Sequence, residues 1–294
     1  MRSIALSEVD AVFLSYDEVY ADFFFEQWNK IFKNLHRVHG VDGLNNAHLK
    51  ACEVATTDYF VLIDADAFPI KQQFNNSLAV DIDEDTVVSN LQSIQGVIKT
   101  YTPHGGIKII NKKLAPAFFE RAKSTCVSYE LQHGFAVLDG PAMSIEFSNQ
   151  SARLSFLSAY KDAMLFLRAT IDPVTYLEKQ DVLQLQGKRQ RLWAWLTNGG
   201  EEPFGFYSIL GAHTAVYNVF TKRVPTTKES LEYFKHEKVD IPILNSYDDM
   251  MKYIIPMYEE LDIPMVTPLK PKHIHTNLYD RFESLANSLD TLGT

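Results

Sequence analysis

The sequence predicts an α/β fold in which a central mixed, mostly parallel sheet is flanked by helices and followed by a helical appendage. Short apolar and β-branched runs alternate with segments of helical spacing over the first third of the chain. The third such run is apolar throughout, which is typical of a strand covered on both faces. Residues 221–294 hold amphipathic stretches, near 228–234 and 247–261, separated by prolines.

Two strand and helix pairs lead to that third strand. Residues 11–14 form an apolar run, and large apolar side chains then recur at helical spacing up to Phe32. Residues 36–38 predict a second strand, and Asn45 is a suitable N-cap for the helix that follows. Residues 59–63 are aromatic and branched, as in a buried strand. This β-α-β-α-β order predicts parallel pairing of the three strands.

The later segments predict further elements and a domain division. A glycine turn runs into a strand over residues 104–110, and residues 116–122 predict a helix. Residues 149–186 are helical in pattern, with an apolar stripe that is expected to face the core. We therefore expect one α/β domain over residues 1–220 and a helical appendage over residues 221–294.

Composition excludes several classes of protein. Arg2, Glu8 and Asp10 interrupt the apolar residues at the start, so the chain lacks a signal-peptide core, and no apolar run is long enough to span a membrane. We therefore expect a soluble, cytoplasmic protein without membrane partners. Cys52 and Cys126 have no disulfide or zinc-site spacing, so both are expected to be buried thiols.

The net charge argues against a protein that grips nucleic acid over its whole surface. Lys and Arg number 28 against 37 Asp and Glu, which gives −9 at neutral pH. Three local clusters of Lys and Arg have two interpretations, either as contact sites for an acidic partner or as solvated surface. The candidate clusters are Lys108, Lys112 and Lys113; Lys188, Arg189 and Arg191; and Lys270 with Lys272.

Asp64 and Asp66 are the strongest local signal for chemistry. They leave the predicted third strand at positions i and i+2, which can place both carboxylates on one side of the chain. Two such carboxylates suit Mg²⁺ or Mn²⁺, and such an ion neutralises charge on a departing diphosphate. Open α/β sheets bind ligands at the carboxyl ends of their strands, so residues 15–18 would lie along the same edge.

Other side chains complete the list of candidates. His213 follows a glycine-rich segment and is the preferred extra metal ligand, ahead of five other histidines, which are His39, His48, His104, His273 and His275. An acceptor base is offered by Asp139, Glu146 and Asp162, and their spacing selects none of them.

Three segments resemble a known family. They are VFLSYDE, RVHGVDGLNNAHLKACEVATTDYFVLIDADA and GGIKI, and the similarity extends over residues 10–215. These segments resemble the GT-A-like glycosyltransferases of tailed bacteriophages, including those that place sugars on hydroxymethylated bases of phage DNA. The resemblance implies a GT-A, Rossmann-like fold, with residues 1–110 as the nucleotide-sugar and metal half and residues 111–220 as the acceptor half.

The resemblance also implies roles for individual residues. The nucleotide base would be bordered by Ser15, Tyr16 and Asp17. The nucleotide pocket would be shaped by His39, Gly40, Asn46 and His48. The metal, Mn²⁺ or Mg²⁺, would be held by Asp64 and Asp66. A turn that approaches donor and acceptor would comprise Gly105, Gly106 and Ile107, followed by Lys108, which would contact phosphate.

Two departures from the family pattern concern the acceptor side. Residues 156–162 are similar to a family helix that ends in Arg and Glu, where this chain has Lys161 and Asp162. This similarity makes Asp162 the expected base. Where the family has a Gly-Ala-Arg-like turn, this chain has His213 after Gly211 and Ala212, which suggests that His213 replaces one contact with a metal bond.

The sequence thus predicts a metal-dependent glycosyltransferase that uses a nucleotide sugar, with UDP implied by the resemblance. Hydroxymethylcytosine in DNA is the expected acceptor, and a glycan, a protein or a small molecule is the alternative. A phosphatase of the haloacid dehalogenase type also places Asp-x-Asp after a strand, with Asp248 and Asp249 as its metal motif, but Phe68 departs from its pattern. A non-catalytic binding module is the third alternative.

Overall fold

The chain forms two compact units in a computed structural model. The structure describes residues 1–74, 78–102, 106–121, 134–168, 188–221 and 241–288. The first unit comprises Met1–Phe147 and Tyr279–Thr294, and the second comprises Ser148–Leu278.

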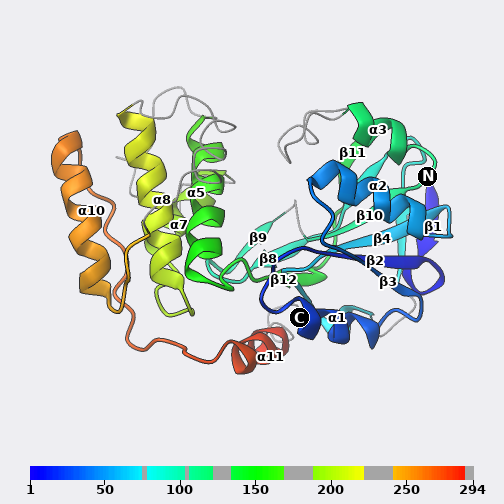
Figure 1. The fold of residues 1–294 in the computed structure, drawn as a ribbon, viewed down its shortest axis with the longest axis horizontal. Coiled ribbons are helices and arrows are strands. Elements are labelled where there is room, and N and C mark those ends of the chain that lie inside the picture. The colour runs from blue at the N-terminus through cyan, green and yellow to red at the C-terminus, as the bar shows by residue number, and fades with distance from the viewer. Residues whose placement is uncertain (75–77, 103–105, 122–133, 169–187, 222–240, 289–294) are drawn as a thin grey trace. The chain divides into compact units, whose positions relative to one another are not determined.

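A six-stranded sheet of order β11-β7-β10-β4-β2-β3 is the centre of the first unit (Figure 1). Its strands are β2 (Asp10–Ser15), β3 (Leu35–His39), β4 (Tyr59–Asp64), β7 (Val88–Asn90), β10 (Ile107–Asn111) and β11 (Phe135–Val137). β10 runs antiparallel to both of its neighbours, whereas the other pairings are parallel. The expected mixed, mostly parallel sheet flanked by helices is therefore confirmed.

Helices cover both faces of this sheet. α1 (Ala21–Asn29) and α2 (Leu44–Val54) connect β2 to β3 and β3 to β4, as the β-α-β-α-β pattern predicts, and α3 (Ala115–Arg121) packs beside α2 (Figure 1). The α2 face is apolar because Val12, Leu14 and Leu62 alternate along β2 and β4 and meet α2 and α3. On the other face, the indole of Trp28 in α1 donates to the carbonyl of Ala67 at 2.7 Å.

Short strands form two smaller sheets that the sequence pattern did not predict. One has the order β5-β12-β8-β9, from β5 (Ala67–Pro69), β12 (Ser144–Glu146), β8 (Ser93–Gln95) and β9 (Thr100–Thr102). The other pairs β1 (Arg2–Ala5) with β6 (Ala79–Ile82), and two 3₁₀ turns lie nearby at Leu6–Glu8 and Lys71–Phe74. Strands of three or four residues are too short to display an alternating pattern.

The described helices of the second unit are α5 (Ala152–Arg168), α7 (Lys188–Thr197), α8 (Gly205–Phe220) and α10 (Tyr247–Leu261) (Figure 1). α5 buries the stripe that the sequence predicted to face the core, including Phe156 and Tyr160. α8 crosses α5 so closely that a Cβ on Gly211 would lie 2.3 Å from the carbonyl oxygen of Phe156. Gly211 therefore belongs to a helix crossing, not to a turn of the kind that the resemblance implied at this place.

The division into units differs from the predicted one at residue 220. The first unit ends at Phe147, α10 packs on α8 within the second unit, and α11 (Leu278–Ser288) returns to the first. An amphipathic pattern shows which face of a helix is buried but does not identify the surface that buries it. The amphipathic stretch expected at residues 228–234 lies outside the described residues. None of the described helices is long and apolar enough to cross a membrane.

α11 is anchored to the first unit by Phe282, which is fully buried. Its ring lies 4.4 Å from that of Phe147 and 4.9 Å from that of Phe24, between ring centroids. Further ring contacts of Phe282 are with Tyr20, Phe23, Phe68 and Tyr279. The C-terminal helix thus closes an aromatic core formed by α1, β5 and the end of β12.

Asp10 begins β2 and is a buried carboxylate, with 2% of its surface exposed. Its Oδ2 atom accepts hydrogen bonds from the amide and the hydroxyl of Thr56 and from the amide of Thr57. Burial raises the pKa of Asp10, but these hydrogen bonds and the nearby His36 together hold the pKa below its usual value. The carboxylate therefore ties the turn before β4 to the start of β2.

We expect Asp10→Asn to lower the free energy of unfolding by about 1–3 kcal/mol at pH 7, since it replaces a charged acceptor of several hydrogen bonds. Because the folded pKa is depressed, the stabilisation is present above about pH 4 and is lost as the pH falls through the folded pKa. Urea unfolding of both proteins at several pH values would show the difference shrinking in acid. The exposed Asp81→Asn is the matched control, and an equal loss in both variants would contradict this role.

Candidate functional site

Three parallel strands of the first unit end at one edge of its sheet. The register pairs Leu14 with Asp64 across β2 and β4, and Ser15 with His39 across β2 and β3. Ser15, His39 and Asp64 are therefore the last residues of neighbouring strands that run in the same direction. The loop after Ser15 lies along the same edge as Asp64, as expected from the sequence.

Gly106 brings the start of β10 against both carboxylates. A Cβ built on Gly106 would lie 2.7 Å from the Cβ of Ala67, 3.5 Å from the Cβ of Asp64 and 3.6 Å from Oδ1 of Asp66. The amide of Asp64 donates to the carbonyl of Gly106 at 2.7 Å. Only glycine fits this position, and the two acidic side chains border the same small space. Gly105 lies outside the described residues.

Glu146 is a third acidic residue at this place. Its Oε1 atom accepts from the amide of Gly106 at 2.7 Å, and β12 pairs Glu146 with Ala67. The next residue, Phe147, donates its amide to the carbonyl of Asp66 at 2.8 Å. Sequence reasoning named Glu146 among three possible bases but could not select it, because β12 is too short to be recognised and lies far along the chain.

Lys108 pairs with Asp64. Its Nζ lies 2.5 Å from Oδ2 of Asp64, and the two side chains are 15% and 38% exposed. His48 lies behind this pair, against the ring of Phe119, and its pKa is lowered to about 4 by burial and by the charge of Lys108, against the opposing effect of Asp64. His48 is 4% exposed, so it lies in the core beside this pair as a neutral ring, and its expected part in shaping the nucleotide pocket stays a prediction.

A pocket of about 440 Å³ lies at the ends of β2 and β3. It is lined by Glu18, Val19, Ala21, Asp22, Arg37 and His39. Arg37 in this lining donates to Ser15 Oγ at 2.9 Å and to Asp22 Oδ1 at 2.6 Å. Ser15 Oγ lies 3.0 Å from Nδ1 of His39. Sequence reasoning missed Arg37, although its position inside a predicted strand, one residue before the end of that strand, was a usable signal.

Four other predicted nucleotide-binding residues lie on the loops that follow β2 and β3 or at the start of α2. Tyr16 and Asp17 are exposed on the loop after β2. Gly40 has a φ of +69°, which favours glycine, and its amide donates to the carbonyl of Ser15 at 3.0 Å. Asn46 donates from its side chain to the carbonyl of Asp42 at 2.9 Å and so closes the loop after β3.

Asp162 lies in the second unit and is held by two neighbours. Its Oδ2 atom accepts from Arg191 at 3.2 Å and from the indole of Trp195 at 3.3 Å. In the described residues this carboxylate therefore connects α5 to α7. Nothing in that arrangement marks it as the expected base.

His213 also lies in the second unit, inside α8, and is fully buried. Its Nε2 atom lies 3.0 Å from the carbonyl of Leu196, which can only accept, and its Nδ1 atom lies 2.8 Å from the hydroxyl of Tyr258. Burial lowers the pKa of His213 to about 4, although the bond to Leu196 acts in the opposite direction. Nε2 of the neutral ring thus donates and Nδ1 accepts, so the expectation of a metal bond is corrected.

We expect His213→Ala to leave Mn²⁺ affinity unchanged and to lower the free energy of unfolding by about 2–4 kcal/mol, because it leaves a cavity and an unpaired carbonyl. Calorimetric titration with Mn²⁺ and chemical unfolding would measure the two effects. The exposed His273→Ala serves as a control for loss of an imidazole. Weaker Mn²⁺ binding by His213→Ala alone would restore the metal assignment.

Asp248 and Asp249 lie in the first turn of α10. Asp248 pairs with Lys270 at 3.1 Å, and Asp249 pairs with Lys252 at 2.8 Å. Their position in a capped helix of the second unit gives no support to the phosphatase alternative, which needs them as a metal motif.

Two of the expected basic clusters can also be placed in part. The charge of Lys270 is partly neutralised by its pair with Asp248. The side chains of Lys188 and Arg189 lie outside the described ones.

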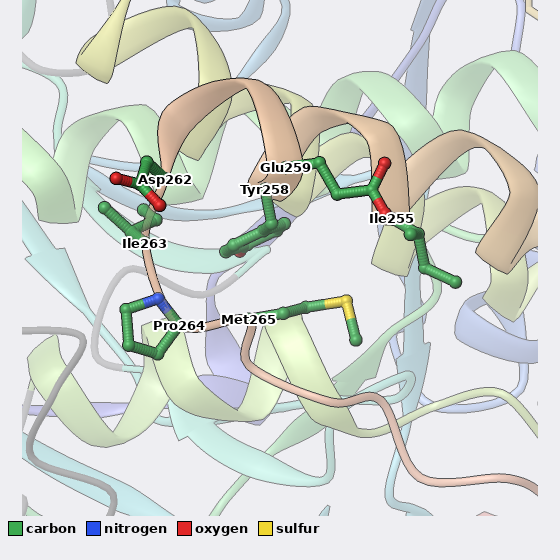
Figure 2. Close-up of a pocket in the computed structure, with 7 residues that line it drawn as sticks. All are labelled: Ile255, Tyr258, Glu259, Asp262, Ile263, Pro264 and Met265. Atoms are coloured by element: carbon green, nitrogen blue, oxygen red, sulfur yellow. The ribbon is translucent and has the colours of Figure 1, made fainter.

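A second hollow, of about 490 Å³, lies at the end of α10 (Figure 2). Its lining residues are Ile255, Tyr258, Glu259, Asp262, Ile263, Pro264 and Met265. Tyr258 is directed into the core through its bond to His213. This hollow holds none of the predicted site residues.

The chain was also compared with known proteins. No protein-family model and no curated protein sequence matches it. A solved glycosyltransferase involved in glycosylation of the major capsid of PBCV-1 aligns at 13% identity and a TM-score of 0.33, over 47% of this chain and 94% of that one.

Two other solved structures align over more of the chain. The mannosyltransferase PcManGT from Pyrobaculum calidifontis, in complex with GDP-Man and Mn²⁺, aligns at 11% identity and a TM-score of 0.34, over 86% of this chain and 85% of that one. TarS of S. aureus, residues 1–349, aligns at 12% identity and a TM-score of 0.25, over 85% and 91%.

Proposed function

We propose that this chain is a metal-dependent glycosyltransferase that moves a sugar from a nucleotide sugar to a hydroxyl acceptor. The observation that carries the proposal is the meeting of Asp64 and Asp66 at the carboxyl edge of the sheet, beside a polar pocket at the ends of β2 and β3. Acidic groups and a pocket along one such edge suit a ligand with a diphosphate in its middle.

The residues present fit a divalent cation. Asp64 and Asp66 meet at Gly106, where a Cβ would lie 3.5 Å from Cβ of Asp64 and 3.6 Å from Oδ1 of Asp66, and carboxylate oxygens are the ligands that Mg²⁺ and Mn²⁺ prefer. In the part of the chain that the structure describes, no three His, Cys, Asp or Glu side chains are grouped closely enough to hold a metal ion by themselves. Water and diphosphate oxygens would complete the coordination, as is usual for Mg²⁺. When bound, the ion supplies positive charge that stabilises the departing diphosphate.

The pocket beside this site is the proposed place of the nucleoside. Arg37 holds Ser15 and Asp22, and His39 contacts Ser15, so the polar groups are fixed before a ligand arrives. Tyr16 is 55% exposed next to the pocket and offers a ring for base stacking. Uridine is the nucleoside that the sequence resemblance implies.

Glu146 is the acidic residue that we propose on the acceptor side of the site, in place of Asp162. It shares the Gly106 turn with Asp64 and Asp66, whereas Asp162 is held by Arg191 and Trp195 in the second unit. Its role would be to accept a hydrogen bond from, and orient, the attacking hydroxyl.

Hydroxymethylcytosine in DNA is the finer proposal for the acceptor, and it rests on the sequence resemblance alone. Mass spectrometry of nucleosides tests it after the protein is incubated with Mn²⁺, a panel of nucleotide sugars and DNA that contains this base. A sugar mass added only to the modified base would support it. Donor hydrolysis without DNA modification would retain a glycosyltransferase with a glycan, protein or small-molecule acceptor.

The same assay separates the reaction classes. Neither hydrolysis nor transfer with any nucleotide sugar, together with hydrolysis of a simple phosphate ester such as p-nitrophenyl phosphate, would overturn the proposed function. Tight nucleotide binding without either reaction would favour the binding-module alternative.

A further inference from the structure

Lys108 projects from the central strand β10 and contacts Asp64 at the end of β4. It lies on β10 opposite Leu62 of β4 and Asn90 of β7, so its stem passes between a core leucine and a buried asparagine before the ammonium meets Asp64. The side chain is 15% exposed. A largely buried ammonium needs a counter-charge, and the Asp64 carboxylate at 2.5 Å provides it.

This arrangement makes Asp64 a shared ligand. One of its oxygens contacts Lys108, while its Cβ lies beside Gly106, close to Oδ1 of Asp66, the second carboxylate of the proposed metal site. A cation held by Asp64 would be repelled by the ammonium that contacts the same carboxylate. The two aspartates and the lysine together carry one net negative charge, against two negative charges without the lysine.

A diphosphate changes this balance. Its oxygens supply several negative charges at the same place, so a divalent cation and an ammonium can both be attracted to it. The lysine that opposes the cation alone would then favour the cation and diphosphate together.

We propose, on the premise of the metal-dependent function above, that Lys108 weakens binding of the free divalent cation to Asp64 and strengthens binding of the nucleoside diphosphate that accompanies the cation. The cation and the nucleotide therefore enter as a pair. A site of this kind stays free of cation until the donor is present.

The test measures two affinities by calorimetry in the wild type and in Lys108→Met. We expect the variant to bind Mn²⁺ alone about tenfold more tightly, since a nearby positive charge is removed. We expect it to bind UDP, at saturating Mn²⁺, about tenfold more weakly, since a phosphate partner is lost. Changes of opposite sign cannot arise from a general loss of structure.

Matched variants sharpen the result. Lys112 directly follows the last residue of β10, at the end of the strand opposite Gly106, and its ammonium donates to the carbonyl of Ala55. Lys112→Met therefore removes the same charge away from the site and should change neither affinity. Lys108→Arg keeps the charge and should keep weak Mn²⁺ binding. If Lys108→Met fails to fold, Lys108→Gln retains a hydrogen-bond donor to Asp64 and should show the same pair of changes.

The outcomes distinguish this inference from the function on which it rests. Unchanged or weaker Mn²⁺ binding in Lys108→Met, together with loss of Mn²⁺ binding in Asp66→Asn, would overturn the role of Lys108 and leave the metal site in place. Absence of both Mn²⁺ and UDP binding in the wild type would instead overturn the proposed function, and the inference with it.

Discussion

Asp66→Asn is expected to lower the rate of sugar transfer by about 100-fold or more while the protein keeps its stability. Its carboxylate borders the space at Gly106 and is half-buried, and an amide of the same shape supplies only one neutral oxygen to a cation. Asp64→Asn should be at least as damaging to transfer. It also removes the counter-charge of Lys108, so Asp66→Asn is the variant that isolates the loss of a metal ligand.

The measurement is kcat/KM for the donor as a function of Mn²⁺ concentration, accompanied by thermal unfolding. Asp58→Asn is the matched control, because Asp58 is exposed and precedes the first residue of the same strand, β4, at the end opposite Asp64. Full activity in Asp66→Asn would remove this residue from the metal site, and full activity in both site variants would remove the metal from the mechanism.

Phe282→Ala is expected to lower the free energy of unfolding by about 3–5 kcal/mol. The ring is fully buried and contacts six aromatic rings from α1, β5, the end of β12 and α11 itself. Its removal would leave a cavity that rigid rings refill poorly, and α11 would lose its main apolar anchor.

Denaturant unfolding and the near-ultraviolet circular dichroism of the aromatic core would report this loss. Tyr101→Ala is the control, because Tyr101 is 62% exposed and its removal should change stability by less than about 0.5 kcal/mol. Equal stability of Phe282→Ala and the wild type would show that α11 does not close the core.

The same variant should also bind UDP more weakly. Phe282 contacts Tyr20, and Tyr20 adjoins residues that line the pocket at the ends of β2 and β3.

The sequence predicted the elements that carry Asp64 for a physical reason. Residues 59–63 are apolar at every position and rich in aromatic and branched side chains, which is typical of a strand covered on both faces, and the helices before it show clear periodicity. Parallel order then follows from the alternation of strands and helices, and it places the ends of β2, β3 and β4 along one edge. Local pattern and strand order are therefore sufficient to locate the acidic pair and the loop after Ser15.

The same reasoning failed where long-range packing decides the outcome. His213 follows a glycine in a pattern that suggested a turn, yet Gly211 is in α8, where its missing side chain admits the backbone of α5. The ring nitrogens of His213 are instead hydrogen-bonded to Tyr258 and Leu196 in the buried core. Spacing along the chain cannot show which buried groups will satisfy a ring nitrogen.

The sequence by itself thus determined the parallel strands, their apolar faces and the acidic residues at the end of β4, because these depend on local periodicity and strand order. Only the tertiary structure decided that Glu146 and Gly106 join Asp66, that Lys108 pairs with Asp64, and that α11 returns to the first unit. Those contacts join residues distant in the chain through short strands and aromatic packing. Their energies depend on three-dimensional fit, which no local pattern records.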